Sequence, residues 1–366
     1  MNKAISFFKK ESVLCISFLL AIISSFFVLP DAQYLSYIDF NTLALLFCLM
    51  AAVAGFNEIG LFSLIGNRIL SKVTSTRSVT VILTALCFCF SPFITNDVAL
   101  ITFVPLSLNV LTAVNRKSLI PITVILQTIA ANVGSSLTPI GNPQNIYIYS
   151  ISNMSFAEIF ITMLPFAAIT IVFSAICVIL QPKYKLSYTS SYNKRLDLKS
   201  LTVYALLFAV GLLAVFKIIN TYIALVIVIA VLLCFNKKIL LRVDYSLLLT
   251  FVGFFVFVGN MGRTSFFSSQ IEGIINGNEI TVSAIGSQVI SNVPAALLFS
   301  GFTDNLKELL IGVNLGGLGT LIASMASLIS YRYIAKALPN EKGKYLIIFS
   351  VLNFILLAAS LLLYIL

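Results

Sequence analysis

The sequence contains no histidine, and only 10% of its 366 residues are charged. Without histidine, the chain has neither the His-Glu-x-x-His motif of a metalloprotease nor a catalytic Cys–His pair. We also find no arrangement typical of a Ser–Lys catalytic dyad. A Gly-x-x-x-x-Gly-Lys-Ser/Thr loop is also absent, which argues against an ATP-driven pump. So few charges cannot cover a soluble surface. A membrane-embedded enzyme is therefore an unfavoured alternative, and lipid is the expected solvent.

Cysteine is also scarce, with six residues that all lie inside or at the ends of apolar runs. Cys87 and Cys89 are two positions apart, a spacing that suits neither a zinc knuckle nor a redox Cys-x-x-Cys pair. We interpret all six as small apolar filling residues. No resident cofactor or structural metal is expected from them.

What the chain has in abundance is apolar sequence: 59% of residues are hydrophobic and the mean hydropathy is +1.05. A spanning helix needs about 20 apolar residues. The first apolar run is long enough to span and lacks a small-x-small cleavage site, so it predicts a helix and not a signal peptide. Full-length candidates cover 12–30, 39–57, 157–181, 200–217, 220–236, 245–261 and 344–366.

Four further apolar regions are interrupted by polar residues. Regions 118–150 and 306–338 carry Gly, Pro, Asn, Ser and Thr at their centres. Regions 79–114 and 280–304 are broken at the tips 95–97 and 291–293. Each arm beside these tips has about 12–16 residues, which is marginal for crossing a bilayer. The pattern predicts two re-entrant hairpins and about nine full crossings in an all-α polytopic membrane protein.

The basic residues occur in short clusters between the apolar runs. With a cytoplasmic N-terminus, only Lys217, Arg263 and Lys307 of the 23 Lys and Arg residues face outward. The positive-inside rule favours this orientation in a cytoplasmic (inner) membrane. Full crossing by the hairpins would satisfy the rule equally well. The net charge of +10 is therefore not a sign of nucleic-acid binding.

The two halves of the chain resemble each other. Ile94-Thr95-Asn96 matches Ile290-Ser291-Asn292, and Asn132-Val133-Gly134 matches Asn314-Leu315-Gly316. When this alignment is extended downstream without a gap, it pairs Thr138 with Thr320, Gly141 with Ala323 and Asn145 with Ser327. Upstream, Asp39 before one apolar run resembles Asp244 before another. With an odd number of crossings, the second half enters from the opposite side. We predict inverted repeats at 1–181 and 220–366, joined by a linker and connecting helix at 182–219.

The interrupted regions predict a binding site. Gly and Pro within 132–145 cannot belong to one regular helix, so this segment, like 313–327, is expected to be unwound near the membrane centre. Unwound carbonyls can coordinate a cation, and the amides that start the next half-helix can hold an anion. Packing of small residues is the alternative, and it explains single glycines or serines better than the cluster in 132–145.

Asp97 is the single acid at a predicted tip. Ionisable residues at membrane depth are costly and usually functional. It would carry a proton or neutralise a bound cation; the alternative is a helix cap that reaches water. Val293 occupies the matching place in the second half, so the predicted site is asymmetric.

The segments 95–99 and 137–145 resemble the arsenite and sodium/proton permease group of the ion transporter superfamily, which includes citrate and divalent-anion/sodium symporters. Ser291-Asn292-Val293-Pro294 and Asn314-Leu315-Gly316-Gly317 resemble the second-half motifs, and the resemblance covers about 39–335. The tips depart from the Ser-Asn-Thr of dicarboxylate members, which argues against a sodium/dicarboxylate assignment.

The resemblance implies an elevator-type secondary transporter, often a homodimer, in which a transport domain moves against a scaffold. We expect an anion or ion substrate coupled to H⁺ or Na⁺, with a sodium/proton antiporter as the alternative. Na⁺ is expected near Thr95, Asn96, Asn292 and Gly134. The full set of expected substrate- and ion-binding residues is Thr95, Asn96, Asp97, Asn132, Gly134, Ser135, Thr138, Pro139, Gly141, Asn142, Pro143, Asn145, Ser291, Asn292, Asn314, Gly316, Gly317 and Thr320.

Overall fold

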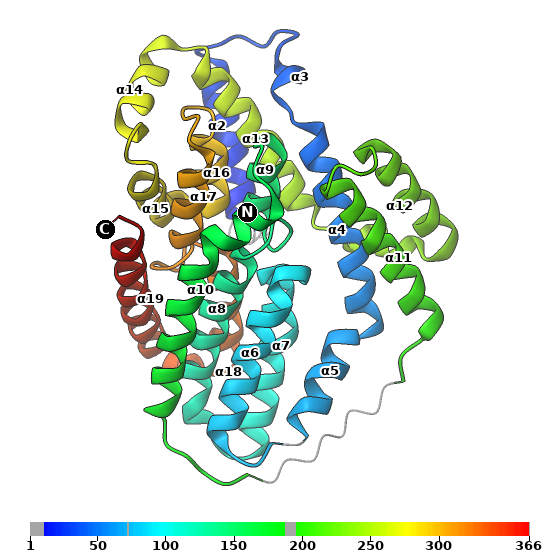
Figure 1. The fold of residues 1–366 in the computed structure, drawn as a ribbon, viewed down its shortest axis with the longest axis vertical. Helices are drawn as coiled ribbons and strands as arrows, with labels where there is room; N and C mark the ends of the chain where they lie inside the picture. Colours follow the sequence, from blue (N-terminus) through cyan, green and yellow to red (C-terminus); the bar gives the residue numbers. More distant parts are fainter. Residues whose placement is uncertain (1–10, 72, 187–194, 366) are drawn as a thin grey trace, which may run out of the picture.

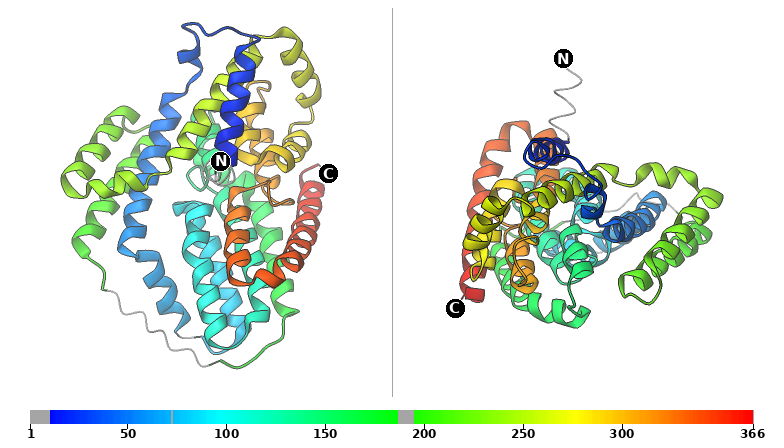
Figure 2. Two further views of the ribbon diagram at one scale, coloured as in Figure 1. Left: turned by 180° about the vertical axis from the view of Figure 1, so that it is seen from behind. Right: turned by 90° about the horizontal axis from the view of Figure 1, so that it is seen from above.

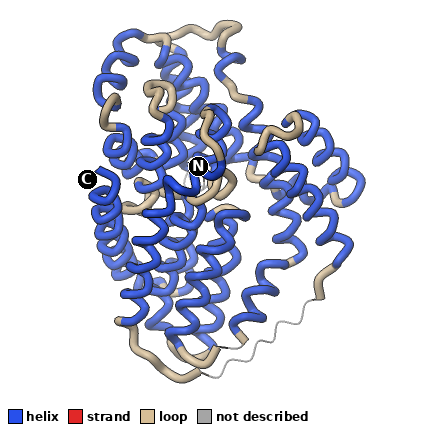
Figure 3. Tube along the Cα trace, in the orientation of Figure 1, coloured by secondary structure: helices blue, strands red, loops and turns tan. Residues whose placement is uncertain are grey.

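The computed structural model describes residues 11–71, 73–186 and 195–365, and all regular elements in these ranges are helices (Figures 1 and 3). Eight helices in this part of the chain are long and apolar enough to cross a membrane. The prediction of an all-helical membrane protein is thus confirmed. Five lysines used in the charge argument lie outside the described residues: Lys3, Lys9, Lys10, Lys72 and Lys194.

The first half of the chain contains nine α-helices in the described residues. They are α2 (Ser12–Ser25), α3 (Tyr34–Tyr37), α4 (Phe40–Ile59), α5 (Leu61–Leu70), α6 (Thr76–Ile94), α7 (Asn96–Ala113), α8 (Ile120–Ser136), α9 (Pro143–Ile151) and α10 (Phe156–Ile179). A short 3₁₀ helix, Lys117–Leu119, precedes α8.

The remainder of the described chain is also helical. Its α-helices are α11 (Leu198–Val215), α12 (Thr221–Phe235), α13 (Tyr245–Gly262), α14 (Ser265–Ile275), α15 (Glu279–Ile290), α16 (Asn292–Phe299), α17 (Leu306–Leu315), α18 (Met325–Ala337) and α19 (Lys342–Ile365). Two 3₁₀ helices, Lys237–Arg242 and Pro339–Glu341, lie between them.

Aspartate starts one long helix in each half. The Asp39 carboxylate accepts a hydrogen bond from the Thr42 amide at 3.0 Å, and Asp244 accepts one from the Leu247 amide at 3.0 Å. The backbone angles of the two caps are nearly the same, φ −77° and ψ 86° against φ −77° and ψ 83°. Both satisfy an otherwise unpaired amide at a helix start. The pairing of these two aspartates from the sequence agrees with their geometry.

Helix lengths differ from the expectation at three places. The arms α6 and α7 have 19 and 18 residues, more than the 12–16 expected; Ser75 caps α6 early by accepting a hydrogen bond from the Ser78 amide. The arm α15 has 12 residues, within the expected range, whereas α16 has 8 and is shorter than expected. The first helix was expected to run to residue 30 but ends at Ser25, where the Ser24 and Ser25 hydroxyls bond back to their own helix.

Small residues let the helices pack closely. α2 lies along α13, and α11 and α12 lie against α4 at the side of the molecule (Figures 1 and 2). A Cβ atom on Gly55 of α4 would lie 2.4 Å from the ring of Tyr204 of α11, so only glycine fits there. α6, α7, α8 and α18 form a second group of contacts, and α15 packs on α16 and α17.

Candidate functional site

Two helical hairpins are broken at non-glycine residues with almost the same backbone conformation. Thr95, between α6 and α7, has φ 73° and ψ 153°; Ser291, between α15 and α16, has φ 75° and ψ 154°. This region is occupied almost only by glycine, and a β-branched residue in it is an outlier. Such strain is held in place by surrounding contacts and occurs mostly at functional sites. The helix breaks predicted at 95–97 and 291–293 are present.

The unwound segments are shorter than the sequence predicted. α8 remains helical through Ser136, so the first break covers 137–142. The second covers 316–324, because α17 runs to Leu315 and α18 begins at Met325. The expectations of unwound backbone over 132–145 and 313–327 are therefore wrong at both ends, and Asn132, Gly134 and Ser135 are helical.

Close helix packing explains why the helix survives Gly134. A Cβ atom there would lie 2.3 Å from the Phe88 carbonyl oxygen of α6 and 2.5 Å from Ser91 Oγ. Gly316 makes the matching approach in the second half, where a Cβ atom would lie 2.6 Å from Ser287 Cβ. Gly134 thus allows helix contact three residues before the first break, and Gly316 allows it at the first residue of the second break. Ser91 and Ser287 were not anticipated, although their equal distance from the two tips could have shown them.

Each hairpin tip is bonded to the unwound segment of its own half. The Asn96 amide donates to the Gly141 carbonyl at 3.3 Å, and the Asn292 amide donates to the Ala323 carbonyl at 2.9 Å. The sequence alignment paired Gly141 with Ala323, and the two residues make the same contact.

A second matched bond ties each unwound segment to the first arm of its hairpin. The Thr138 hydroxyl donates to the Pro92 carbonyl at 2.6 Å, and the Thr320 hydroxyl donates to the Gln288 carbonyl at 3.1 Å. Thr138 and Thr320 were also paired by the alignment. The internal similarity in the sequence therefore corresponds to repeated three-dimensional contacts.

Asparagine side chains join the two halves to each other. Asn142 Nδ2 donates to Asn314 Oδ1 at 3.1 Å, and at the matching position Ser324 Oγ donates to Asn132 Oδ1 at 3.1 Å. Asn314 Nδ2 in turn donates to Asn145 Oδ1 at 2.7 Å. All five side chains are buried. We call this set of reciprocal bonds, made by Asn132, Asn142, Asn145, Asn314 and Ser324, the cross-brace.

Four helices begin around one small pocket of about 10 Å³. Backbone amides at a helix start are unpaired within the helix and carry a partial positive charge, so they attract anions. Lysine and arginine are not among the lining residues. The pocket is lined by Asn96 and Asp97 of α7, Pro143 and Gln144 of α9, Asn292 and Val293 of α16, Met325 of α18 with its cap Ser324, and Leu247 of α13.

Asp97 gives this pocket its acid. Its backbone amide is bonded to Asn96 Oδ1 at 2.9 Å, whereas its own Oδ1 atom is buried and has no hydrogen-bond partner among the described residues. A buried carboxylate oxygen without a partner is costly unless a proton or a cation neutralises it. The Val293 amide makes the matching bond to Asn292 Oδ1 at 2.9 Å, so the two tips differ in charge and not in backbone.

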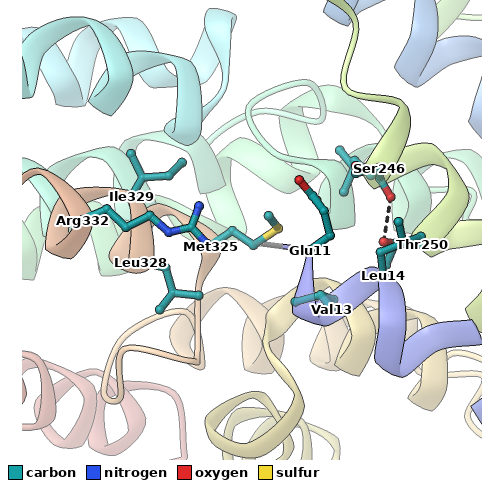
Figure 4. Close-up of a pocket in the computed structure, with 10 residues that line it drawn as sticks. Glu11, Val13, Leu14, Ser246, Thr250, Met325, Leu328, Ile329 and Arg332 are labelled. Carbon is teal, nitrogen blue, oxygen red and sulfur yellow. Dashed lines mark hydrogen bonds between the residues drawn. The ribbon is translucent and has the colours of Figure 1, made fainter. Parts of the chain in front are cut away.

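A larger cavity of about 780 Å³ adjoins the small pocket and shares Asp97, Pro143, Leu247 and Met325 with it. Its lining includes mainly apolar residues of α4 and the first hairpin tip with Thr95. Charged residues lie elsewhere in the lining: Glu11, Arg242, Asp244 and Arg332. Figure 4 shows Arg332 and Met325 of α18 beside Glu11, near the end of a smaller hollow lined by Ser246 and Thr250.

Most of the predicted binding residues fall into three groups. Asn96, Asp97, Pro143 and Asn292 line the small pocket, and Thr138, Gly141 and Thr320 fix the tips. The third group builds the helix contacts or the cross-brace and comprises Asn132, Gly134, Ser135, Asn142, Asn145, Asn314 and Gly316. Of the four residues expected around Na⁺, Asn96 and Asn292 line the small pocket, Thr95 lines the large cavity, and Gly134 lines neither. Pro139 is buried and lines neither cavity, whereas Ser291 and Gly317 lie beside Asn292.

Comparison with known proteins supplies the family. The sequence profile described as "Citrate transporter" (CitMHS) matches residues 4–326. The chain belongs to this family. It is a secondary transporter of the ion transporter superfamily and an integral membrane protein, not an enzyme.

Individual relatives agree with this assignment. The chain is 32% identical over 313 residues to the uncharacterized transporter MJ0456 of Methanocaldococcus jannaschii, covering 83% of this chain and 84% of that protein. It is 32% identical over 320 residues to the inner membrane protein YbiR of Escherichia coli, covering 84% of each. A more distant relative is the putative transporter arsB of Dictyostelium discoideum, 24% identical over 173 residues, which are 47% of this chain and 30% of that protein.

Proposed function

We propose that the protein moves a small inorganic or organic anion across the cytoplasmic membrane, driven by H⁺ or Na⁺, and binds it in the small pocket. The observation that carries this proposal is the meeting of four helix starts, from both halves of the chain, around one point. Helix starts favour negative charge, and half-helices at the midplane are the usual binding elements of secondary transporters.

The size of the pocket limits what enters it. A volume of about 10 Å³ is close to the space for one water molecule. One oxygen atom of an oxyanion fits this space, and the rest of the substrate would extend into the adjoining cavity of about 780 Å³. This geometry supports a small anion, or one small anionic group of a larger molecule.

Asp97 supplies a reason for coupling. Two unit negative charges about 4 Å apart repel each other by roughly 4 kcal/mol at an effective dielectric constant of 20. That amount corresponds to an affinity loss of roughly a thousandfold. An anion therefore binds well only when a proton or a cation has neutralised Asp97. The driving ion and the substrate would then bind together.

The matched contacts support an inverted-repeat elevator. The first hairpin lies in the lower part of Figure 1 and the second in the upper part, so their tips approach from opposite ends. We propose repeats at 1–181 and 220–366 with the 182–219 connection between them, about nine crossings, re-entrant hairpins and a cytoplasmic N-terminus. We also propose a homodimer that holds the scaffold still while the site moves.

The second candidate function is a sodium/proton antiporter on the same fold. The observation that favours it is the unpartnered Asp97 Oδ1 in a pocket without lysine or arginine, an arrangement that a cation can satisfy directly. In this case the transported species is the cation, and no anion is required.

Uptake by purified protein in proteoliposomes separates the two candidates. A panel of citrate, phosphate, sulfate and arsenite is tested with Na⁺ and proton gradients imposed separately. We expect one of these anions to be taken up faster when one of the two gradients is imposed. Asn292→Ala should abolish this gradient-driven uptake, whereas the control substitution Asn353→Ala, on α19, should leave it intact. Exchange of Na⁺ for H⁺ that is unaffected by every anion would reject anion transport and favour the antiporter.

A further inference from the structure

The side chain of Gln288, on the first arm of the second hairpin, is surrounded by backbone. Its Nε2 atom donates to three carbonyl oxygens, at 3.1 Å to Ala284, 2.9 Å to Gly316 and 2.9 Å to Leu318. Its Oε1 atom accepts from the Thr320 amide at 2.9 Å. One side chain thus holds most of the second unwound segment.

The number of carbonyls around Nε2 is unusual. A primary amide nitrogen has two N–H donors, and here three acceptors face it. Three converging carbonyl oxygens are a ligand set that suits a hard cation such as Na⁺ or Li⁺. The surplus of acceptors makes the position of Nε2 favourable for a full positive charge.

No such arrangement is present among the residues of the first half that the structure describes. The contact between Thr138 and the Pro92 carbonyl matches the one between Thr320 and the Gln288 carbonyl, so Pro92 is the counterpart of Gln288. Proline has no side-chain donor. The first unwound segment is held instead by Asn145 Nδ2, which donates to the Ser136 carbonyl at 3.1 Å and the Thr138 carbonyl at 2.9 Å.

The two halves therefore differ in where positive charge is needed. The first half has the unpartnered acid Asp97 at its tip, and the second has Val293 there and an amide nitrogen inside a ring of carbonyls. We infer that Gln288 is a built-in substitute for a cation: its amide nitrogen fills the carbonyl ring of the second half, which leaves the first half to bind the driving ion. This inference rests on the proposed ion-coupled function and predicts one driving ion for each substrate.

The test replaces the nitrogen and measures Na⁺ binding. Gln288→Glu keeps the shape of the side chain but exchanges the two N–H donors for an oxygen, so the ring gains a negative charge and needs a cation. All variants also carry Asp97→Asn, which removes the other cation site. Thermal unfolding in detergent is compared in NaCl and in choline chloride, and bound ²²Na⁺ is counted by equilibrium dialysis.

We expect Asp97→Asn alone to bind no Na⁺ and to unfold at the same temperature in both salts. With Gln288→Glu added, the unfolding temperature should rise by a few degrees with Na⁺ in a saturable manner, and about one ²²Na⁺ should bind per chain. Gln288→Lys, whose ammonium has three donors for three carbonyls, should be stable without responding to Na⁺.

Gln127→Glu is the matched control, since Gln127 is a buried glutamine whose amide meets Cys87 Sγ and Ser107 Oγ and no ring of carbonyls. A Na⁺ response equal to that of Gln288→Glu, or no response in the folded Gln288→Glu protein, overturns the inference. If Gln288→Glu does not fold, ²²Na⁺ binding is measured with Gln288→Ala instead. Binding of ²²Na⁺ to this variant supports the inference, and absence of binding contradicts it. Because no readout uses transport, failure of the anion assay would be a separate result.

Discussion

The cross-brace makes a quantitative prediction for Asn314. Substitution Asn314→Ala removes three hydrogen bonds, to Asn142, to Asn145 and to the Leu310 carbonyl. The bonds to Asn142 and Asn145 join different helices, and interhelical bonds in membrane proteins contribute about 0.6 kcal/mol each on average, so their loss costs roughly 1 kcal/mol. Asn145 Oδ1 is then buried without a partner, which adds about 1–3 kcal/mol. The expected total is about 2–4 kcal/mol in the free energy of unfolding.

Asn353 provides the control for this measurement. It is also a fully buried asparagine, but its Nδ2 atom bonds only the Phe349 carbonyl of its own helix, and its Oδ1 atom already has no partner in the described structure. Asn353→Ala should cost about 1 kcal/mol or less. Reversible unfolding in mixed micelles gives both values. Equal destabilisation by the two substitutions would refute the cross-brace as a tie between the halves.

A double-mutant cycle isolates the bond between Asn142 and Asn314, and a second isolates the one between Ser324 and Asn132. Each coupling should be about 0.6 kcal/mol, the average for such bonds in membranes, and at most about 1.7 kcal/mol. The two couplings should be similar because both bonds measure 3.1 Å. A coupling of zero at one position and not the other would show that the two-fold arrangement is not kept in the bilayer.

Four further predictions concern transport, stability and topology. Asn96→Ala and Asn292→Ala should each abolish uptake while the protein still inserts, since both line the pocket; wild-type uptake by either would remove that tip from the site. If Asp97 carries the proton, Asp97→Asn should abolish proton-driven uptake but keep substrate exchange. If Asp97 binds Na⁺, the same substitution should weaken the affinity for Na⁺. Uptake with unchanged dependence on pH and on Na⁺ would show that Asp97 is only a helix cap. Gly141→Ala should destabilise the protein by about 1–3 kcal/mol, because a Cβ atom would lie 2.0 Å from the Ser135 carbonyl oxygen, whereas a glycine with free space such as Gly343 should tolerate alanine. Single cysteines in the 181–199 loop should resist an impermeant reagent added outside intact cells, and rapid labelling would reverse the proposed orientation.

The sequence predicted the helix breaks well because their cause is local. Thr95 and Ser291 stand between apolar arms, and the residues aligned downstream of them, Gly141 and Ala323, make matched contacts. Composition gave a wrong prediction where tertiary packing determines the backbone conformation. Gly134 was interpreted as a helix breaker, yet it keeps its helical conformation because α6 lies against it and leaves no room for a side chain.

The cross-brace and Gln288 were beyond the reach of sequence patterns. Residues 142 and 314 are distant in the chain, and their pairing depends on how the two halves meet. Gln288 differs from its counterpart Pro92, so a search for similarity between halves passes over it. The difference between Asp97 and Val293 was visible in the sequence, but the role of Gln288 is seen only when its contacts are known.

The cross-brace also has a consequence for the order in which the protein is made. Asn145 leaves the ribosome 169 residues before its partner Asn314, a delay of roughly 8–34 s at 5–20 residues per second. During that time the polar groups of the first half are inserted without the partners that later satisfy them. The nascent first half must therefore keep water, lipid headgroups or an insertion factor at these asparagines. Its final conformation is completed only when the second half arrives, so the two halves mature as one unit and a separately produced first half should be a substrate for membrane proteases.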